Sequence, residues 1–168
     1  MKDGIRKKVI NLKIGVYDII NNPLPQLYLI KEINVNSNDF DSDENIVYML
    51  NRHLKMDKLN SEHIYALSLT YSNNPKGIIQ ISVGKCDSCD ADLRGLATGL
   101  LLTGAEQFMC FHNHPGGNRN ISEADIKLTQ RYKELENTIG IRFIRHIMIT
   151  QDYYANCIDY NDNHIPFN

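Results

Sequence analysis

Apolar and polar residues alternate along several short segments of the chain, as expected for strands that bury one face. Strong turn sequences interrupt this pattern twice, as NNPLP in the first part of the chain and as SNNPKG further on. Strands are therefore expected at 8–20, 26–35, 63–71, 77–84, 107–112 and 141–149, with a short further strand from about residue 151. The SNNPKG turn predicts that the third and fourth strands form a hairpin.

Other segments place apolar residues three or four positions apart, which is the spacing of an amphipathic helix. Helices are expected over about 46–54, 92–103 and 122–138. Asp41 and Glu44 have the spacing of a capping box for the first helix, and Asp92 is placed to open the second. Gly104 and Gly140 follow the second and third helices as stop signals.

This order of strands and helices predicts an α/β domain with a mixed central β-sheet flanked by helices. A hairpin pairs its strands antiparallel, whereas a strand–helix–strand connection can pair them parallel. With 168 residues the chain is long enough for one domain with a real core and too short for two, so we expect a single domain over 1–168.

Composition and charge narrow the classes of function. Hydrophobic residues make up 42% and charged residues 23%, which is ordinary for a globular protein. The net charge of −2 and pI of about 6.3 argue against a dedicated nucleic-acid binder. The N-terminus lacks the apolar core of a signal peptide, and no apolar run of membrane-spanning length occurs. We therefore expect a cytoplasmic protein with no membrane partner and with reduced cysteines.

One short run combines residues that suit metal chemistry. His112 and His114 end the strand at 107–112 two residues apart, so their imidazoles point to one side. A Pro-Gly-Gly sequence then turns the chain, and Ser122 and Asp125 open the next helix. A simple turn followed by a helix cap would explain each part separately. Together, two imidazoles and one carboxylate suit a zinc ion with a fourth position open for water, which is the catalytic arrangement.

The run from His112 to Gly117, followed by Ser122 and Asp125, resembles the JAMM motif of the JAB/MPN metallopeptidase superfamily, and more closely the RadC-like JAB domain. The similarity extends over about 60–158, and residues 1–59 would complete the domain with strands and a helix. The resemblance implies a cytidine-deaminase-like α/β/α sandwich that holds one zinc ion and hydrolyses a peptide or isopeptide bond. The family also carries a DNA-repair label.

The resemblance further implies roles for individual residues. His112, His114 and Asp125 would be the zinc ligands, and Ser122 would stabilise the oxyanion of the tetrahedral intermediate. A glutamate from an upstream strand would act as the general base. Counting back from Gly84 without a gap, that position is held by Gln80, whose neutral amide cannot usefully accept a proton. Losing a general base typically costs about 10²–10⁴ in rate.

Two functions therefore remain open at the level of sequence. The first is a zinc-dependent hydrolase, impaired because Gln80 replaces the glutamate, that acts on a peptide or protein substrate. The second is a non-catalytic MPN-like binding or scaffolding module. Other departures from the family pattern, at Gly116, Ile121 and Arg145, indicate a diverged member.

Nearby residues offer alternatives for the ligands and the base. Cys86 and Cys89 form a C-x-x-C pair that could bind zinc with the two histidines, although this leaves the Ser122–Asp125 match unexplained. His146 is expected to be a packed residue rather than a ligand. Acids that could replace the missing glutamate are Asp87, Asp90, Asp92 and Glu106.

Overall fold

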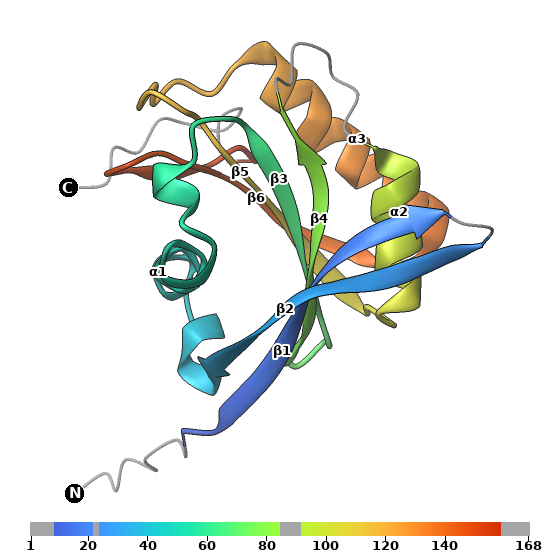
Figure 1. Cartoon of the computed structure of the whole chain (residues 1–168). Helices are drawn as coiled ribbons and strands as arrows, with labels where there is room; N and C mark the ends of the chain where they lie inside the picture. The colour runs from blue at the N-terminus through green and yellow to red at the C-terminus, as the bar shows by residue number, and fades with distance from the viewer. Residues whose placement is uncertain (1–8, 22–23, 85–91, 159–168) are drawn as a thin grey trace, which may run out of the picture.

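A single sheet in the strand order β2-β1-β4-β3-β5-β6-β7 organises the computed structural model (Figure 1). The structure describes residues 9–21, 24–84 and 92–158. The strands are β1 (Asn11–Asn21), β2 (Pro25–Asn36), β3 (His63–Leu69), β4 (Pro75–Val83), β5 (Gln107–Asn113), β6 (Arg142–Ile149) and β7 (Tyr154–Asn156). The helices are α1 (Asp43–Leu54), α2 (Leu93–Leu102) and α3 (Glu123–Ile139), with 3₁₀ turns η1 (Ser37–Phe40) and η2 (Met56–Lys58) beside α1.

The sheet is mixed, as the sequence predicts. β3 and β4 form the expected antiparallel hairpin, and β5 and β6 run parallel because α3 carries the chain back between them. β1 pairs antiparallel with β2 and parallel with β4, so the N-terminal hairpin extends the sheet beyond β4. This order places β3 and β5 near the centre, where all seven residues of β5 are buried.

Helix α1 covers one face of the sheet, and α2 and α3 cover the other (Figure 1). The α1 face packs a core that includes Leu50, Leu67 and Phe111. The opposite face packs a second core that includes Leu96 and Cys110. Because neighbouring residues of a strand point to opposite faces, Cys110 and His112 share the face covered by α2 and α3. That face is where the chemistry-bearing residues meet.

The ends of the helices follow capping rules, with one correction to the sequence prediction. Helix α1 is capped by Ser42, whose hydroxyl accepts from the Asn45 N–H at 3.2 Å, and not by Asp41. A serine one residue further along competes successfully for the cap because its oxygen can reach the third amide. Helix α3 begins after Ser122 and ends at Gly140 in a left-handed conformation, as predicted. None of the described helices combines the length and apolar content needed to cross a bilayer.

Asn113, the last residue of β5, ties this strand to the beginning of β3. Its side-chain oxygen accepts from the His63 backbone N–H at 2.8 Å, and its side-chain N–H₂ donates to the Ser61 carbonyl at 3.0 Å. Asn113 is only 1% exposed, so these bonds are shielded from water. The entry to β3 and the end of β5 are therefore held as one unit next to the two histidines.

Candidate metal centre

Strand β5 delivers the two histidines to one edge of the sheet. His112 lies within the strand, and His114 follows it, held there by a bond from its backbone N–H to the Ile149 carbonyl at 2.9 Å. Gly116 and Gly117 then have φ of 83° and 79°, in the left-handed region that glycine adopts readily. The Pro-Gly-Gly sequence thus makes the sharp turn that sequence analysis assigned to it.

Asp125 reaches the histidines because of the cap of α3. The Ser122 hydroxyl accepts from the Asp125 N–H at 3.2 Å, while Asp125 Oδ2 accepts from both the N–H and the hydroxyl of Ser122, each at 2.7 Å. This is a capping box in which aspartate takes the place of glutamate. The same bonds that start the helix fix the direction of the carboxylate. The helix cap and the candidate metal ligand are therefore one structure.

The two imidazoles and the carboxylate converge. His112 Nε2 lies 3.1 Å from Asp125 Oδ1, and His114 Nε2 lies 3.5 Å from Asp125 Oδ2. The two Nε2 atoms are 3.1 Å apart. One ligand atom from each residue lies within 4.8 Å of the others, as in a group that can hold a metal ion. The structure therefore brings together the three residues that the sequence selected as ligands, whose role as ligands stays a prediction.

The ring nitrogens and carboxylate oxygens of this trio suit a bound cation. His114 Nδ1 donates to the Asn118 carbonyl at 3.0 Å, so in the neutral ring Nε2 carries a lone pair directed at Asp125. The bond to Asp125 raises the pKa of His114, against the effect of burial. Burial alone would raise the pKa of Asp125, but hydrogen bonds from His112 and His114 outweigh it and hold this pKa far below its ordinary range. The carboxylate is thus charged and faces two imidazole nitrogens, a set of ligand atoms that fits Zn²⁺.

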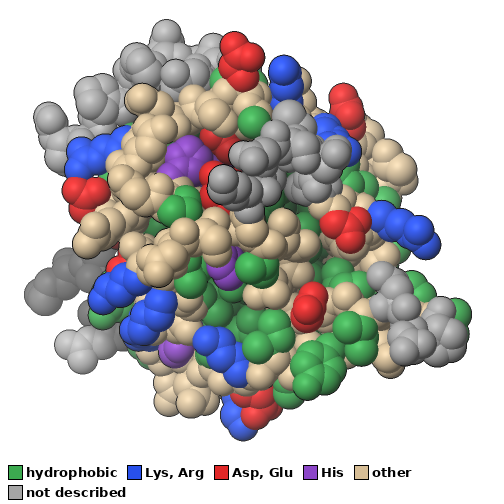
Figure 2. Space-filling view, turned by 45° about the horizontal axis from the view of Figure 1, so that its top comes forward, with side chains coloured by type: hydrophobic (Ala, Val, Ile, Leu, Met, Phe, Trp, Pro, Cys, Tyr) green, Lys and Arg blue, Asp and Glu red, His purple; other side chains and the backbone are tan. Residues whose placement is uncertain are grey.

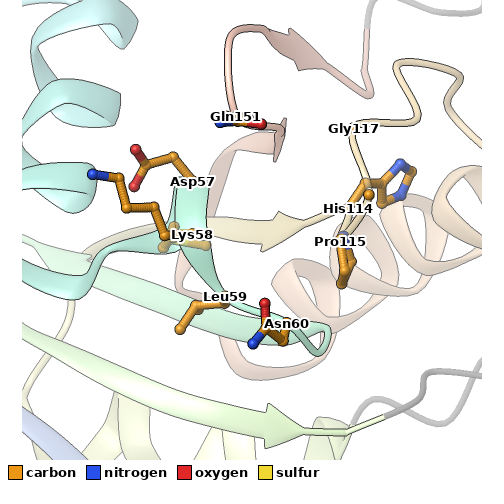
Figure 3. A pocket seen from close by; sticks show the side chains of 10 residues that line it. Asp57, Lys58, Leu59, Asn60, His114, Pro115, Gly117 and Gln151 are labelled. Atoms are coloured by element: carbon orange, nitrogen blue, oxygen red, sulfur yellow. The ribbon is translucent and has the colours of Figure 1, made fainter.

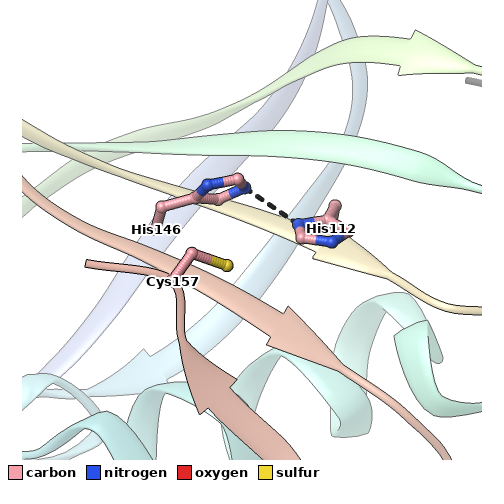
Figure 4. A group of neighbouring side chains, drawn as sticks. All are labelled: His112, His146 and Cys157. Atoms are coloured by element: carbon pink, nitrogen blue, oxygen red, sulfur yellow. Dashed lines mark hydrogen bonds between the residues drawn. The ribbon is translucent and has the colours of Figure 1, made fainter. Parts of the chain in front are cut away.

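A second group of possible ligands lies behind the first. His112, His146 and Cys157 come within 4.8 Å of one another, and all three are buried (Figure 4). His112 Nδ1 and His146 Nε2 are already joined by a hydrogen bond of 2.8 Å. Burial raises the pKa of the Cys157 thiol, which keeps it protonated and a poor metal ligand. The first trio is therefore the better candidate for a metal position, and His146 is a buried neighbour of it, as sequence analysis expected.

An open cleft adjoins the trio on the side of His114. Its volume is about 310 Å³, and it lies between residues 56–60, the turn at 114–117 and Gln151 (Figure 3). Both polar and apolar groups line it, among them Asp57 and Leu59. The space-filling view shows a histidine side chain at the surface with acidic side chains beside it (Figure 2). A molecule bound in the cleft would reach the metal position without opening the core.

Gln80 does not lie beside the trio, contrary to the role that the resemblance gave its position. Gln80 in β4 pairs with Tyr65 in β3, and its side-chain oxygen accepts from the Tyr65 hydroxyl at 3.2 Å. Tyr65 and its β5 partner Phe111 belong to the core under α1. His112 is the next residue and points to the opposite face. A count along the sequence gives the place of Gln80 in β4, but it does not give which face of the sheet that place occupies.

Glu62 is the acid that sequence analysis missed. It immediately precedes β3, and Asn113 binds the backbone on both sides of it. Ile64 pairs with His112, and Glu62 and His114 each lie two residues beyond that pair, so the alternation of side chains along a strand directs both to the same face. Glu62 is also close enough for its charge to raise the pKa of His114. A signal in the sequence was available only through the β3–β5 pairing, which joins residues about 50 positions apart.

The other acids considered from the sequence have different roles. Asp92 caps α2 by accepting from the Gly95 N–H at 2.7 Å. Glu106 accepts from the Tyr71 N–H at 2.7 Å, at the far end of β5. Four further positions raised by the sequence, among them the C-x-x-C pair, lie outside the described residues: Cys86, Asp87, Cys89 and Asp90.

A layered α/β fold with a His-x-His strand end and a Ser-x-x-Asp helix start defines a domain of JAB/MPN type. The family model of the RadC-like JAB domain matches residues 40–159, and the chain belongs to this family. The match includes α1 and every strand from β3 onward, and it begins earlier than the sequence resemblance suggested. The hairpin of β1 and β2 lies outside it.

Curated relatives show the same similarity. A UPF0758 protein from Desulforudis audaxviator is 33% identical over 94 residues, which cover 56% of this chain and 41% of the relative. UPF0758 proteins from Clostridium acetobutylicum and Listeria monocytogenes are each 33% identical, over 95 and 93 residues, and 42% of each relative is covered. The match thus spans about two fifths of the length of these relatives.

Proposed function

We propose that this domain is a zinc-dependent hydrolase that cleaves a peptide or isopeptide bond. One observation carries the proposal. Two imidazole nitrogens and a charged carboxylate oxygen converge, and one of the two histidines, His114, lines an open cleft. Three protein ligands leave a coordination position for water or substrate, which distinguishes catalytic zinc sites from structural ones. A bound zinc ion would lower the pKa of a water molecule toward about 7 and polarise the carbonyl group of the substrate.

Residues around the trio would then share the remaining tasks. Ser122 holds the carboxylate of Asp125 through two hydrogen bonds of 2.7 Å, which keeps one oxygen turned toward His112. To stabilise an oxyanion, as the family resemblance implies, the Ser122 hydroxyl would have to turn away from Asp125. Glu62 would accept a proton from the attacking water and pass it to the leaving amine, because its charge acts on His114 and it is not one of the three proposed ligands.

With Glu62 as the base, the non-catalytic alternative loses the support that Gln80 gave it. A catalytically silent module was suggested by Gln80, because an amide in place of the general base would remove the proton acceptor. Gln80 is bonded to Tyr65 on the α1 face, so its identity does not bear on the base. With Glu62 as the candidate base, no feature of the described residues favours a non-catalytic binding or scaffolding module over the hydrolase.

The shape of the cleft suggests an extended substrate. The 310 Å³ volume and its open side suit a segment of peptide chain more than a folded surface. The Gly116–Gly117 turn lines one side of the cleft and carries no side chains there. A peptide whose carbonyl faces the trio would lie between this turn and the residues of η2. We propose a peptide or protein tail as the substrate class.

Zinc content and hydrolysis together test the proposal. The purified chain is loaded with zinc, dialysed and analysed for bound metal, and is then assayed against a mixture of peptides and isopeptide-linked peptides by mass spectrometry. We expect one zinc ion per chain and cleavage that His114→Ala abolishes. His53→Ala, a histidine replacement in the last turn of α1, is the matched control and should keep both properties. A chain that binds no zinc, or a zinc-loaded chain that cleaves none of the peptides, contradicts the proposal.

A further inference from the structure

A chain of buried hydrogen bonds leads from the backbone of α3 to His112. The Thr129 hydroxyl donates to the Asp125 carbonyl at 2.7 Å and also lies 2.7 Å from His146 Nδ1. His146 Nε2 lies 2.8 Å from His112 Nδ1 (Figure 4). Thr129, His146 and His112 are 4%, 0% and 4% exposed, so water does not compete for these bonds. The far nitrogen of His112 faces Asp125.

The direction of each bond follows from counting protons. A carbonyl oxygen can only accept, and two oxygens 2.7 Å apart without a proton between them would repel, so the single hydroxyl proton of Thr129 points at the Asp125 carbonyl. The hydroxyl oxygen can then only accept from His146, which fixes the proton of His146 on Nδ1. Deep burial disfavours a charged imidazole at this position, so His146 Nε2 carries a lone pair and accepts from His112 Nδ1–H.

We infer that Thr129 and His146 are positioning residues that fix the tautomer of His112, so that its Nε2 presents a lone pair to the metal position. This inference rests on the proposed metal site for its purpose, although the hydrogen-bond chain exists without it. His114 reaches the same state by a shorter route, because its Nδ1 donates directly to the Asn118 carbonyl. Both histidines are thus anchored to a backbone carbonyl, one directly and one through two side chains.

The opposite arrangement would block the site. If the Thr129 proton pointed at His146 instead, the chain of donors would reverse and place a proton on His112 Nε2, directed at Asp125 3.1 Å away. A metal ion would then have to displace that proton and turn over every bond behind it. Residues that hydrogen-bond to a metal-binding histidine without touching the metal typically contribute about 10–100-fold in metal affinity. We call the hydrogen-bond chain from Thr129 through His146 to His112 the relay. A change at Thr129 or His146 should therefore lower metal affinity measurably, although neither residue is a proposed ligand.

Two matched pairs of variants test the relay through zinc affinity, measured by competition with a chromophoric chelator. Thr129→Val keeps the shape but removes the hydroxyl, and Thr129→Ser restores it. His146→Leu removes the acceptor for His112, and His146→Gln offers a side-chain oxygen in a similar place. We expect Thr129→Val and His146→Leu to lose about 10–100-fold in affinity. Thr129→Ser and His146→Gln should stay within about threefold of the parent chain, and equal affinities within each pair would overturn the inference.

A second measurement does not depend on zinc. Nitrogen-15 NMR of the metal-free chain at about pH 8.5, two units above the ordinary histidine pKa, reports which ring nitrogen carries each proton. We expect protons on His146 Nδ1 and on His112 Nδ1, with a coupling from His112 Nδ1 to His146 Nε2. A proton on His146 Nε2 would overturn the relay even if zinc binds. A chain that binds no zinc but shows the expected protons would disprove the proposed hydrolase and keep the tautomer assignment.

Discussion

The two ends of strand β5 both carry buried polar groups, but they are balanced differently. At the beginning of the strand, Gln107 donates to the Thr70 carbonyl at 2.9 Å and to the Asn73 side-chain oxygen at 2.7 Å. Donors and acceptors match there, which is the mark of a structural network. At the other end, once Nδ1 carries the proton of each neutral ring, as inferred above, His112, His114 and Asp125 direct three acceptors at one point. A surplus of acceptors is what separates a candidate cation site from an ordinary buried network.

Removing the carboxylate charge of Asp125, at the end of β5 that carries the two histidines, should have the largest effect on zinc affinity. Asp125→Asn keeps the size of the side chain and part of the helix cap but supplies no carboxylate. We expect zinc affinity to fall by more than the ~10–100-fold typical of outer-shell changes, because a direct ligand is lost. Thermal unfolding provides the control, since a folded variant that still binds zinc like the parent would place the metal elsewhere.

The role of Glu62 can be separated from that of the ligands. Glu62→Gln should lower kcat by about 10²–10⁴ while zinc content stays unchanged, because a general base is lost and no ligand is touched. Peptide hydrolysis and metal analysis on the same sample measure both effects.

Gln80 provides the matched control on the other face of the sheet. Gln80→Glu should give no gain in rate, since residue 80 faces Tyr65 under α1. A gain from this variant would show that residue 80 reaches the metal position after all.

Acidification should weaken metal binding by His112, His114 and Asp125. Hydrogen bonding to Asp125 raises the pKa of His114, so protons compete for Nε2 from a higher pH than for an ordinary histidine. Affinity is highest above the raised pKa and falls as the pH decreases through it, by up to about tenfold per pH unit for each proton displaced. Zinc titrations over a pH series measure the slope. An affinity independent of pH below neutrality would contradict the assignment of His114.

Buried His146 should make folding sensitive to acid. Its folded-state pKa is lowered by burial, so the unfolded chain binds the proton first, below its ordinary pKa of about 6.5. The free energy of unfolding should therefore fall with decreasing pH below that value, by up to about 1.4 kcal/mol per pH unit. Urea unfolding of the parent chain and of His146→Gln should show a shallower slope for the variant, and parallel slopes would rule out this contribution.

A change at the beginning of β5, where Gln107 lies, should have the smallest effect, which is on stability, and no effect on zinc binding. Gln107→Leu leaves the Thr70 carbonyl and the Asn73 oxygen without this donor, which should lower the free energy of unfolding by about 1–3 kcal/mol. Zinc affinity should remain that of the parent chain. A loss of zinc binding in this variant would mean that the two ends of the strand are not independent.

Local chemistry made much of the site readable in the sequence. The spacing of His112 and His114, the Pro-Gly-Gly turn and the Ser122 cap each depend on a few neighbouring residues, and each is present in the structure. The mixed sheet and the β3–β4 hairpin were predictable for the same reason.

Pairings between distant segments were not readable. The insertion of β1 beside β4, the face of Gln80 and the nearness of Glu62 to His114 depend on strand registers. A period-two pattern gives which residues share a face within one strand, but not which face of the sheet that is, and a register shift changes it. The bond between His146 and His112 likewise depends on the parallel pairing of β5 with β6.

Asn113 gives this architecture a mechanical consequence. It lies between the two histidines in the chain, while its amide group grips the main chain on either side of Glu62. A displacement of the entry to β3 would therefore carry the tip of β5 with it, so that the acid and the imidazoles would shift together. Replacing this one amide would remove the link between Glu62 and the two histidines without changing any reactive group itself.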